Sequence, residues 1–297
     1  MTEPEKIVYV DRETGALVSE TVMGDRALRF AYETALGRTM WPLLFGSGLV
    51  SALMGKYYDS KLSRRAAATL SAMPGCRADE AEKPVAEYAS FNAFFIRRLK
   101  RGQRLPSSVD GAPVVPADGR ITVYSDLRDD EPIPVKGALR TVAELCGAPA
   151  KKANFDLAVI RLAPVDYHRF HYPCDCVQKL PARRLGGRYH SVNPIALKRR
   201  PDLYVENARE VTRLVSDRFG EFVMIEVGAF GVGSIVQTAG AGRHACLDEK
   251  GYFKFGGSTV ILVLPAGIMR FDDDLAANSA AGRETLVRCG TSLAHLI

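Results

Sequence analysis

The feature that most restricts the fold of this chain is a series of short β-type runs that follows Pro106. Each run has five or six residues and is rich in β-branched or aromatic side chains, and turns containing Gly, Pro and Asp separate the runs. The runs are residues 120–124, 157–162, 222–227, 234–238 and 259–264. This pattern predicts a mostly antiparallel β domain, which we place at residues 109–297.

The region before this domain has a different pattern and is predicted to be helical. A polar leader with one short strand at Ile7–Val10 comes first, and residues 24–38 carry apolar side chains at helical spacing. The predicted fold class is therefore α+β, with an N-terminal helical region at residues 1–108 followed by the β-rich domain.

Residues 40–55 form an uncharged stretch of 16 residues. A membrane-spanning helix needs about 20 apolar residues, and Pro42, Gly46 and Gly48 interrupt this stretch. We therefore expect no membrane span here. Trp41 and the basic residues that follow the stretch are typical of a helix at a membrane interface, while a core helix with a solvated polar flank explains them equally well.

Charge and cysteine content restrict the partners and the compartment. The net charge of +6 favours an anionic partner, either a membrane surface or nucleic acid. No signature of a nucleic-acid-binding module is present, so we expect no nucleic-acid partner. Six scattered cysteines and a charged start without an apolar signal core indicate free thiols in a reducing, cytosolic setting.

A basic segment at residues 91–104 ends the helical region. It combines three phenylalanines with five basic residues and contains no acidic residue. Its arginines, including Arg97 and Arg98, can receive phosphate or carboxylate groups. The alternative is a basic face that only contacts water.

The segment Lys254–Val263 joins a glycine pair to a buried strand. Gly256 and Gly257 give the backbone freedom just before Ser258, the first hydroxyl after that point. The simple interpretation is a turn that enters a strand. The second is that the Gly257–Ser258 peptide bond itself reacts, since a serine hydroxyl lies one short ring closure from the preceding carbonyl.

Two of the five histidines, His168 and His171, lie three residues apart in a segment rich in polar groups. Histidine is suited to proton transfer near neutral pH. Together with Cys174 and Cys176 the pair also makes a set of four zinc ligands. The gap of one residue between the cysteines is tighter than in common structural zinc sites, so we predict no metal and keep zinc as an alternative.

A different combination is an acid, a base and a nucleophile from three distant stretches, Asp118, His171 and Ser258. In such a triad the carboxylate orients the imidazole, and the imidazole takes the serine proton. Spacing in the sequence does not show that the three residues meet.

The motifs together resemble the phosphatidylserine decarboxylase family, the pyruvoyl-dependent enzymes, over residues 91–265. Any single motif is weak, but their order along the chain is specific. The Gly-Gly-Ser-Thr stretch departs from the Leu-Gly-Ser-Thr form of better-known members, while Gly257 and Ser258 are intact. The motifs are Phe91–Lys100, Pro116–Gly119, Val135–Gly137, Ala163–His171, Ser191–Pro194, Glu206–Glu210, Val232–Ile235 and Gly256–Thr259.

The resemblance implies a proenzyme that cuts itself between Gly257 and Ser258. Asp118, His171 and Ser258 match the family's self-cleavage triad, and the serine becomes a covalent pyruvoyl group at the start of the small chain. That group forms a Schiff base with phosphatidylserine, and the reaction releases carbon dioxide and phosphatidylethanolamine. His168 corresponds to the residue tied to decarboxylation and protonation.

The resemblance also implies where the enzyme works. We expect a peripheral enzyme at the cytoplasmic face of the cell membrane, with phosphatidylserine in an anionic bilayer as substrate and a homodimer as its assembly. Ser191, Arg97 and Arg98 are the candidate substrate-binding residues. Two alternatives remain: a pyruvoyl-dependent decarboxylase of a free amino acid, and a non-catalytic lipid-binding or zinc-stabilised module.

Overall fold

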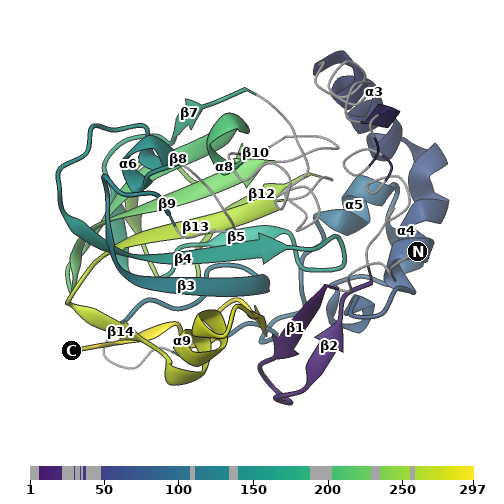
Figure 1. Ribbon diagram of the computed structural model, residues 1–297. Helices are drawn as coiled ribbons and strands as arrows, with labels where there is room; N and C mark the ends of the chain where they lie inside the picture. The colour runs from purple at the N-terminus through teal and green to yellow at the C-terminus, as the bar shows by residue number, and fades with distance from the viewer. Residues whose placement is uncertain are drawn as a thin grey trace.

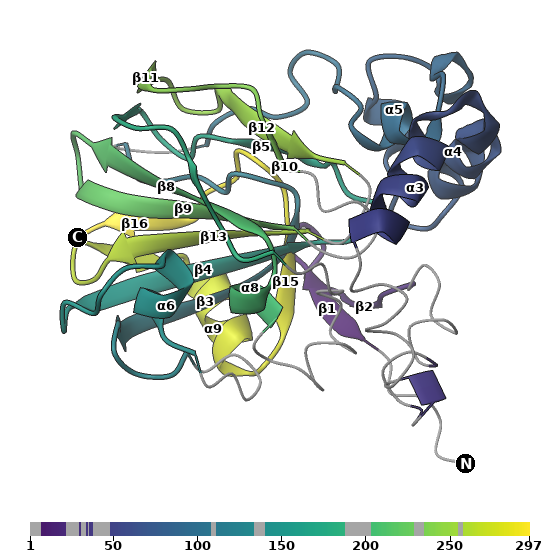
Figure 2. The same ribbon diagram turned by 90° about the horizontal axis from the view of Figure 1, so that it is seen from above.

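The computed structural model describes residues 7–21, 30, 34, 36–37, 48–107, 111–133, 140–187, 203–228, 235–254 and 258–297. A large twisted sheet forms one end of the molecule, and a group of helices from the first third of the chain forms the other (Figure 1). The view from above shows the same separation between α3, α4 and α5 and the strands (Figure 2).

The main sheet has 11 strands within the described residues. Its order is β11-β6-β8-β9-β13-β4-β3-β15-β1-β2, with β7 paired to β8. All neighbours are antiparallel except β1 and β15, which are parallel. The strands are β1 Val8–Asp11, β2 Leu17–Ser19, β3 Gly119–Arg128, β4 Asn154–Leu162, β6 Cys176–Gln178, β7 Arg183–Leu185, β8 Arg209–Ser216, β9 Gly220–Gly228, β11 Gly242–His244, β13 Ser258–Pro265 and β15 Glu284–Val287.

Strand β13 lies between β4 and β9 and is buried on both faces. Successive side chains of a strand point to opposite faces, so Val260, Leu262 and Leu264 join one hydrophobic cluster while Ile261 and Val263 join the other. This explains why the sequence shows a continuous apolar run here and not an alternating one.

A three-stranded sheet packs beside the main one and carries the histidine segment. Its order is β10-β12-β5, with bounds Ile235–Gln237, Glu249–Phe253 and Arg169–His171. The fully buried Lys250 of β12 donates to Glu226 of β9 at 2.9 Å, and Gln237 of β10 hydrogen-bonds to both. A buried pair of this kind is stable only with complete hydrogen bonding, so it fixes the small sheet against the main one.

The helical end is joined to the sheets by aromatic packing. Ser90 begins α5 by accepting a hydrogen bond from the backbone N–H of Ala93 at 3.1 Å, as an N-cap residue does. Phe91 and Phe94 of α5 are buried in a cluster with Val165, which follows β4. The remaining elements are α3 Gly48–Asp59, η1 Lys61–Ser63, α4 Arg64–Ser71, η2 Ala78–Glu80, η3 Val85–Glu87, α5 Phe91–Phe95, α6 Val142–Cys146, α8 Leu203–Glu206, α9 Asp273–Ala280, β14 Met269–Phe271 and β16 Ala294–Leu296.

The fold confirms the predicted α+β class and the mostly antiparallel β domain. Four of the predicted runs lie within longer strands, and the run 234–238 contains the shorter strand β10, Ile235–Gln237. The leader strand is also present, and its pairing with β15 places it in the main sheet.

Three predictions concern residues that the structure describes only in part. Most of 24–38, residues 40–47 and the boundary near 108 lie outside the described residues, so the domain division stays a prediction. Of the helices in the described ranges, none has both the length and the apolar character that a membrane crossing requires.

Candidate active site

Ser258 is the first residue of β13 and is fully buried. Its backbone pairs with Leu162 of β4 and Gly228 of β9. Its Oγ has no hydrogen-bond partner in the described part of the chain. A buried hydroxyl without a hydrogen-bond partner costs free energy. An unpaired buried polar atom of this kind is typical of a functional site. Gly257 and Ser191 lie outside the described residues.

Asp118 lies immediately before β3, and the backbone fixes its position. At Gly119 a Cβ atom would lie 2.7 Å from the carbonyl oxygen of Arg161. Only glycine allows β3 to approach β4 this closely. The Asp-Gly pair is therefore explained by packing as well as by chemistry.

The carboxylate of Asp118 is held by three donors. Arg104 donates from Nε to Oδ1 at 2.9 Å and from a terminal nitrogen to Oδ2 at 2.5 Å. The backbone N–H of Cys289 donates to Oδ1 at 2.9 Å. Burial alone would lower the pKa of Arg104, but its hydrogen bonds and charge pairing with Asp118 and Glu80 raise it. This bidentate pairing fixes the direction of the carboxylate.

His171 ends β5, and its backbone N–H donates to the carbonyl of Pro116 at 2.9 Å. Its Nδ1 lies 3.4 Å from the Sγ of Cys289. Burial lowers the pKa of His171, and the charges of Glu249 and Asp118 partly oppose that shift. The structure therefore brings Asp118 and His171 together around Cys289. Within the described ranges no hydrogen bond joins His171 to Ser258.

His168 is fully buried, and its ring lies 3.8 Å from the ring of Phe95, centroid to centroid. Its Nδ1 is 3.0 Å from the backbone oxygen of Asp166. Since a carbonyl oxygen only accepts, Nδ1 carries the hydrogen and Nε2 presents a lone pair. Nε2 is buried and has no partner among the described residues.

The protonation state of His168 follows from its surroundings. Burial lowers the pKa of His168 to about 3, and the charges of Arg97 and Arg120 act in the same direction, against the hydrogen bond to the backbone of Asp166. The ring is therefore neutral near pH 7, and Nε2 is able to accept a proton.

This buried neutral histidine predicts acid sensitivity. The unfolded chain binds a proton at residue 168 below its ordinary pKa of 6.5, whereas the folded chain does so only near 3. The free energy of unfolding should therefore fall as the pH decreases through this window. Urea unfolding of the uncut Ser258→Ala chain at several pH values measures it. The variant His168→Gln should lose part of the pH dependence, and an unchanged slope would contradict the prediction.

Sequence reasoning missed two residues that contact the proposed acid and base. Arg104 was identified only as one member of a basic segment, and its pairing with Asp118 depends on the packing of the chain before β3. Glu80 accepts a hydrogen bond at 2.8 Å from the same terminal nitrogen of Arg104 that donates to Asp118. Cys289 had no local signal at all, since its role depends on the turn that follows β15.

The two arginines among the candidate substrate-binding residues differ in their exposure to solvent. Arg97 is 2% exposed, while its neighbour Arg98 is exposed.

Regarding the zinc alternative, no group of three or more His, Cys, Asp or Glu side chains in the described ranges is arranged to hold a metal ion. His168 faces Phe95, and His171 faces Cys289.

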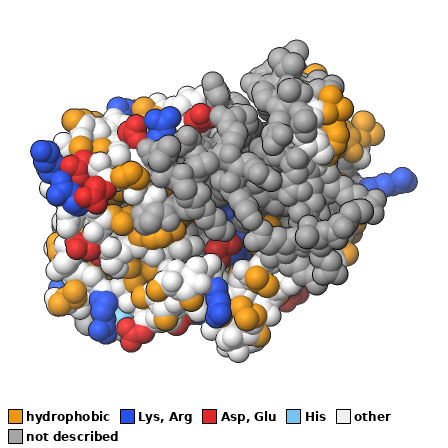
Figure 3. All heavy atoms as spheres, viewed as in Figure 1, with side chains coloured by type: hydrophobic (Ala, Val, Ile, Leu, Met, Phe, Trp, Pro, Cys, Tyr) orange, Lys and Arg blue, Asp and Glu red, His pale blue; other side chains and the backbone are white. Residues whose placement is uncertain are grey.

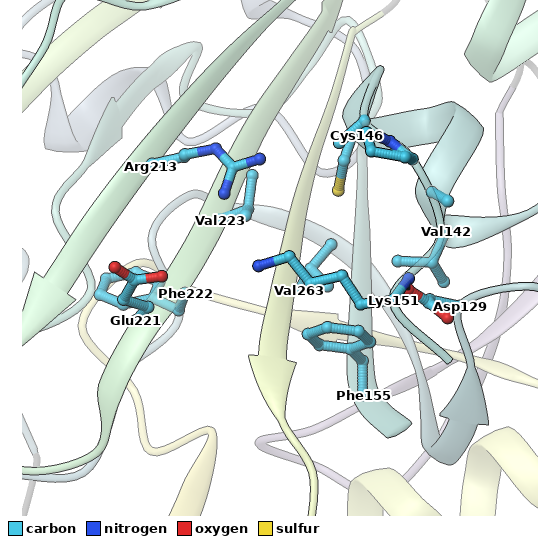
Figure 4. Close-up of a pocket in the computed structure, with 13 residues that line it drawn as sticks. Asp129, Val142, Cys146, Lys151, Phe155, Arg213, Glu221, Phe222, Val223 and Val263 are labelled. Carbon is cyan, nitrogen blue, oxygen red and sulfur yellow. Dashed lines mark hydrogen bonds between the residues drawn. The ribbon is translucent and has the colours of Figure 1, made fainter. Parts of the chain in front are cut away.

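An open pocket lies away from these residues (Figure 4). Its wall includes Val263, five positions along β13 from Ser258 and on the opposite face of the sheet. Arg213 and Lys151 extend over it, and Phe155 closes one side. The pocket is therefore separate from the group formed by Asp118, His171 and Cys289.

Comparison with known proteins identifies the family. The family model described as phosphatidylserine decarboxylase matches residues 91–295. Three relatives are each named phosphatidylserine decarboxylase proenzyme. One from Chlamydia muridarum is 39% identical, covering 98% of both chains. One from Chlamydia trachomatis is 36% identical, covering 97% of both. One from Ruminiclostridium cellulolyticum is 35% identical, covering 98% of both. The chain therefore belongs to the phosphatidylserine decarboxylase family and is a decarboxylase.

Proposed function

We propose that this chain cuts itself between Gly257 and Ser258, and that the cut enzyme converts phosphatidylserine to phosphatidylethanolamine and carbon dioxide. One observation carries the proposal. Ser258 begins the central strand β13, and its Oγ is buried and has no hydrogen-bond partner in the described residues. The relatives that match nearly the whole chain are named as proenzymes, and this supports the proposal.

The cut uses groups of the chain itself. His171 takes the hydroxyl proton of Ser258, and Oγ attacks the carbonyl carbon of Gly257. The bond from that carbon to the nitrogen of residue 258 then breaks, and His171 returns the proton to this nitrogen, so that the amide becomes an ester. Loss of a proton from Cα of residue 258 then breaks the Cβ–Oγ bond. The large chain leaves as a carboxylate that ends at Gly257. Water adds to the remaining dehydroalanine, and ammonia leaves. The negative charge of Asp118, which raises the pKa of His171 against the effect of burial, stabilises the imidazolium that forms.

Ser258 fits a covalent pyruvoyl group because its side chain is enclosed and forms no competing hydrogen bond with the described residues. The pyruvoyl group supplies an electrophilic carbonyl for the substrate amine and an electron sink for the carbon that bears the carboxylate. No exogenous cofactor is needed in this proposal.

His168 has the right protonation state for a proton carrier. Its Nε2 lone pair can hold the proton that is released when the substrate amine condenses and deliver it to the carbon that has lost carbon dioxide. The low pKa makes His168 a weak base and, once protonated, a strong acid. The stacked Phe95 keeps the ring in place.

The helical end supports the proposal of a peripheral enzyme on an anionic bilayer. Leu53, Tyr57 and Leu62 are 58%, 50% and 80% exposed, and exposed Lys and Arg side chains lie among them in the sequence. Hydrophobic side chains gather at this end of the molecule in Figure 3. Apolar groups beside basic groups suit an anionic membrane surface. We also propose that the enzyme lies at the cytoplasmic face of the cell membrane and that it forms a homodimer.

An intact mass spectrum of the purified protein under denaturing conditions tests this function. We expect two chains, with a small chain of 40 residues, from 258 to 297, that begins in a pyruvoyl group. The mixture should release carbon dioxide from phosphatidylserine in vesicles. A single chain of 32.4 kDa that stays uncut at neutral pH and releases no carbon dioxide would disprove the proposal.

A further inference from the structure

We propose that Arg97 binds the phosphodiester of the substrate head group, so that the enzyme accepts a phospholipid and not a free amino acid. The inference rests on the proposed function and names the part of the substrate that this residue contacts. Nothing in the family assignment identifies the contact. It follows from one buried arginine, the pocket beside it and the position of that pocket.

The first observation is that Arg97 is buried without full hydrogen bonding. Its side chain donates one hydrogen bond, to the backbone oxygen of Val165 at 3.2 Å, and its guanidinium lies 4.9 Å from the ring centre of Phe94. Its Nε and one terminal nitrogen have no partner in the described residues. Buried charged donors are costly when they stay unpaired, so these two nitrogens are suited to an anion that arrives from outside.

The second observation is the open pocket that Arg97 lines. Five arginines and three acidic residues line it, so the lining is positively charged overall. Four of the arginines already have a carboxylate partner: Arg77 with Glu80, Arg104 with Asp118, Arg120 with Asp166, and Arg288 with Glu13. Among the lining residues that the structure describes, Arg97 is the arginine without a carboxylate partner.

The third observation is that the pocket adjoins the proposed catalytic groups. Asp118 is part of its lining. The charge of Arg97 also contributes to the low pKa of His168, after burial and the opposing backbone hydrogen bond. In phosphatidylserine only two carbons and one oxygen separate the amine nitrogen from the phosphorus atom. A phosphate receptor must therefore lie close to the reacting groups, and the pocket that Arg97 lines reaches Asp118.

The chemistry of the reaction favours the phosphodiester over the carboxylate as the ligand of Arg97. The carboxylate loses its charge when it leaves as carbon dioxide. A guanidinium bound to it would stabilise the ground state more than the transition state and would slow the reaction. The phosphodiester keeps its charge throughout, so a bound arginine holds the substrate without this penalty. Arginine also matches two phosphate oxygens with a planar fork.

Calorimetric titration of the uncut Ser258→Ala chain tests the contact without any turnover. The probes are glycerophosphoserine, glycerophosphoethanolamine and inorganic phosphate. We expect Arg97→Gln to weaken binding of both diesters by about 10- to 100-fold, the effect of removing hydrogen bonds to a charged group. Arg270→Gln is the matched control, because Arg270 is an arginine outside this pocket whose side chain is 73% exposed. It should bind both diesters as tightly as the parent chain.

Other outcomes would overturn the inference. Loss of glycerophosphoserine binding alone would mean that Arg97 holds the carboxylate. Inorganic phosphate that binds as tightly as the diesters would mean a free-phosphate site. Unchanged diester binding would remove Arg97 from recognition. If the glutamine variant does not fold, Arg97→Lys keeps the charge but loses the fork. It should still weaken both diesters, and full affinity in that variant would overturn the inference too.

A second measurement distinguishes a structural role of Arg97 from direct contact with the substrate. With Ser258 intact, Arg97→Gln should cut itself at the parental rate by mass spectrometry. Slow cutting together with weak binding would show that the substitution disturbs the fold and would overturn the specific contact. Failure of the parent chain to cut would instead reject the proposed function, while the diester titrations would still report on Arg97.

Discussion

Replacement of Ser258 by alanine should abolish both self-cleavage and decarboxylation. Alanine has no oxygen to attack the carbonyl of Gly257. It also has no leaving group on Cβ, so the elimination that gives dehydroalanine, and from it a pyruvoyl group, cannot occur. The chain should therefore stay at 32.4 kDa at neutral pH over days. Carbon dioxide release from phosphatidylserine should fall below detection. Intact mass spectrometry and a radiolabelled carboxyl substrate measure the two effects separately.

The matched control is Thr212→Val, which removes another buried hydroxyl from the same sheet. Thr212 lies in β8, is 1% exposed, and its Oγ1 has no partner in the described residues, like Oγ of Ser258. This variant should cut and turn over normally, since valine has almost the same shape as threonine. A Ser258→Ala chain that is cut, or that decarboxylates, would show that residue 258 is not the source of the reactive group.

Strand β13 shows why much of the fold could be predicted from the sequence. Its run of apolar residues after a glycine pair has a single simple solution, a strand buried on both faces. The same reasoning identified the strands on either side, β4 and β9. The order of the strands depends on contacts between distant segments. Thus the parallel pairing of β1 with β15 had no local signal.

Only some residues of the candidate site could be predicted from the sequence. Asp118 and His171 carry reactive groups in recognisable motifs, and the fold brings both to Cys289. Arg104 and Cys289 are ordinary residues locally, and only the chain path places them beside Asp118. The burial of Arg97, in contrast to the exposure of Arg98, is likewise a tertiary effect. It follows from the packing of α5 against the segment after β4.

Replacement of His168 by alanine should separate self-cleavage from decarboxylation. The proposed cutting step uses His171 as its base, so the variant should still yield two chains. Decarboxylation should fall by about 10²- to 10⁴-fold, the usual contribution of a positioned acid or base. The neutral imidazole with a free Nε2 is the only described group that we assign to carry the proton between nitrogen and carbon. Mass spectrometry of the chains and single-turnover release of carbon dioxide measure the two steps.

The control for this variant is His244→Ala. His244 also stacks on an aromatic ring, at 4.0 Å from Tyr172, but it bonds to the backbone of Gly240 and lies on β11 at the edge of the sheet. Its loss should leave both steps intact. The pH dependence adds a test that packing alone does not predict. If His168 carries the proton, turnover of the parent chain should fall at acidic pH, as the pH approaches the low pKa of His168 of about 3, and His168→Ala should lack this acidic limb. An uncut His168→Ala chain would place His168 in the first step, and normal turnover would exclude it from the second.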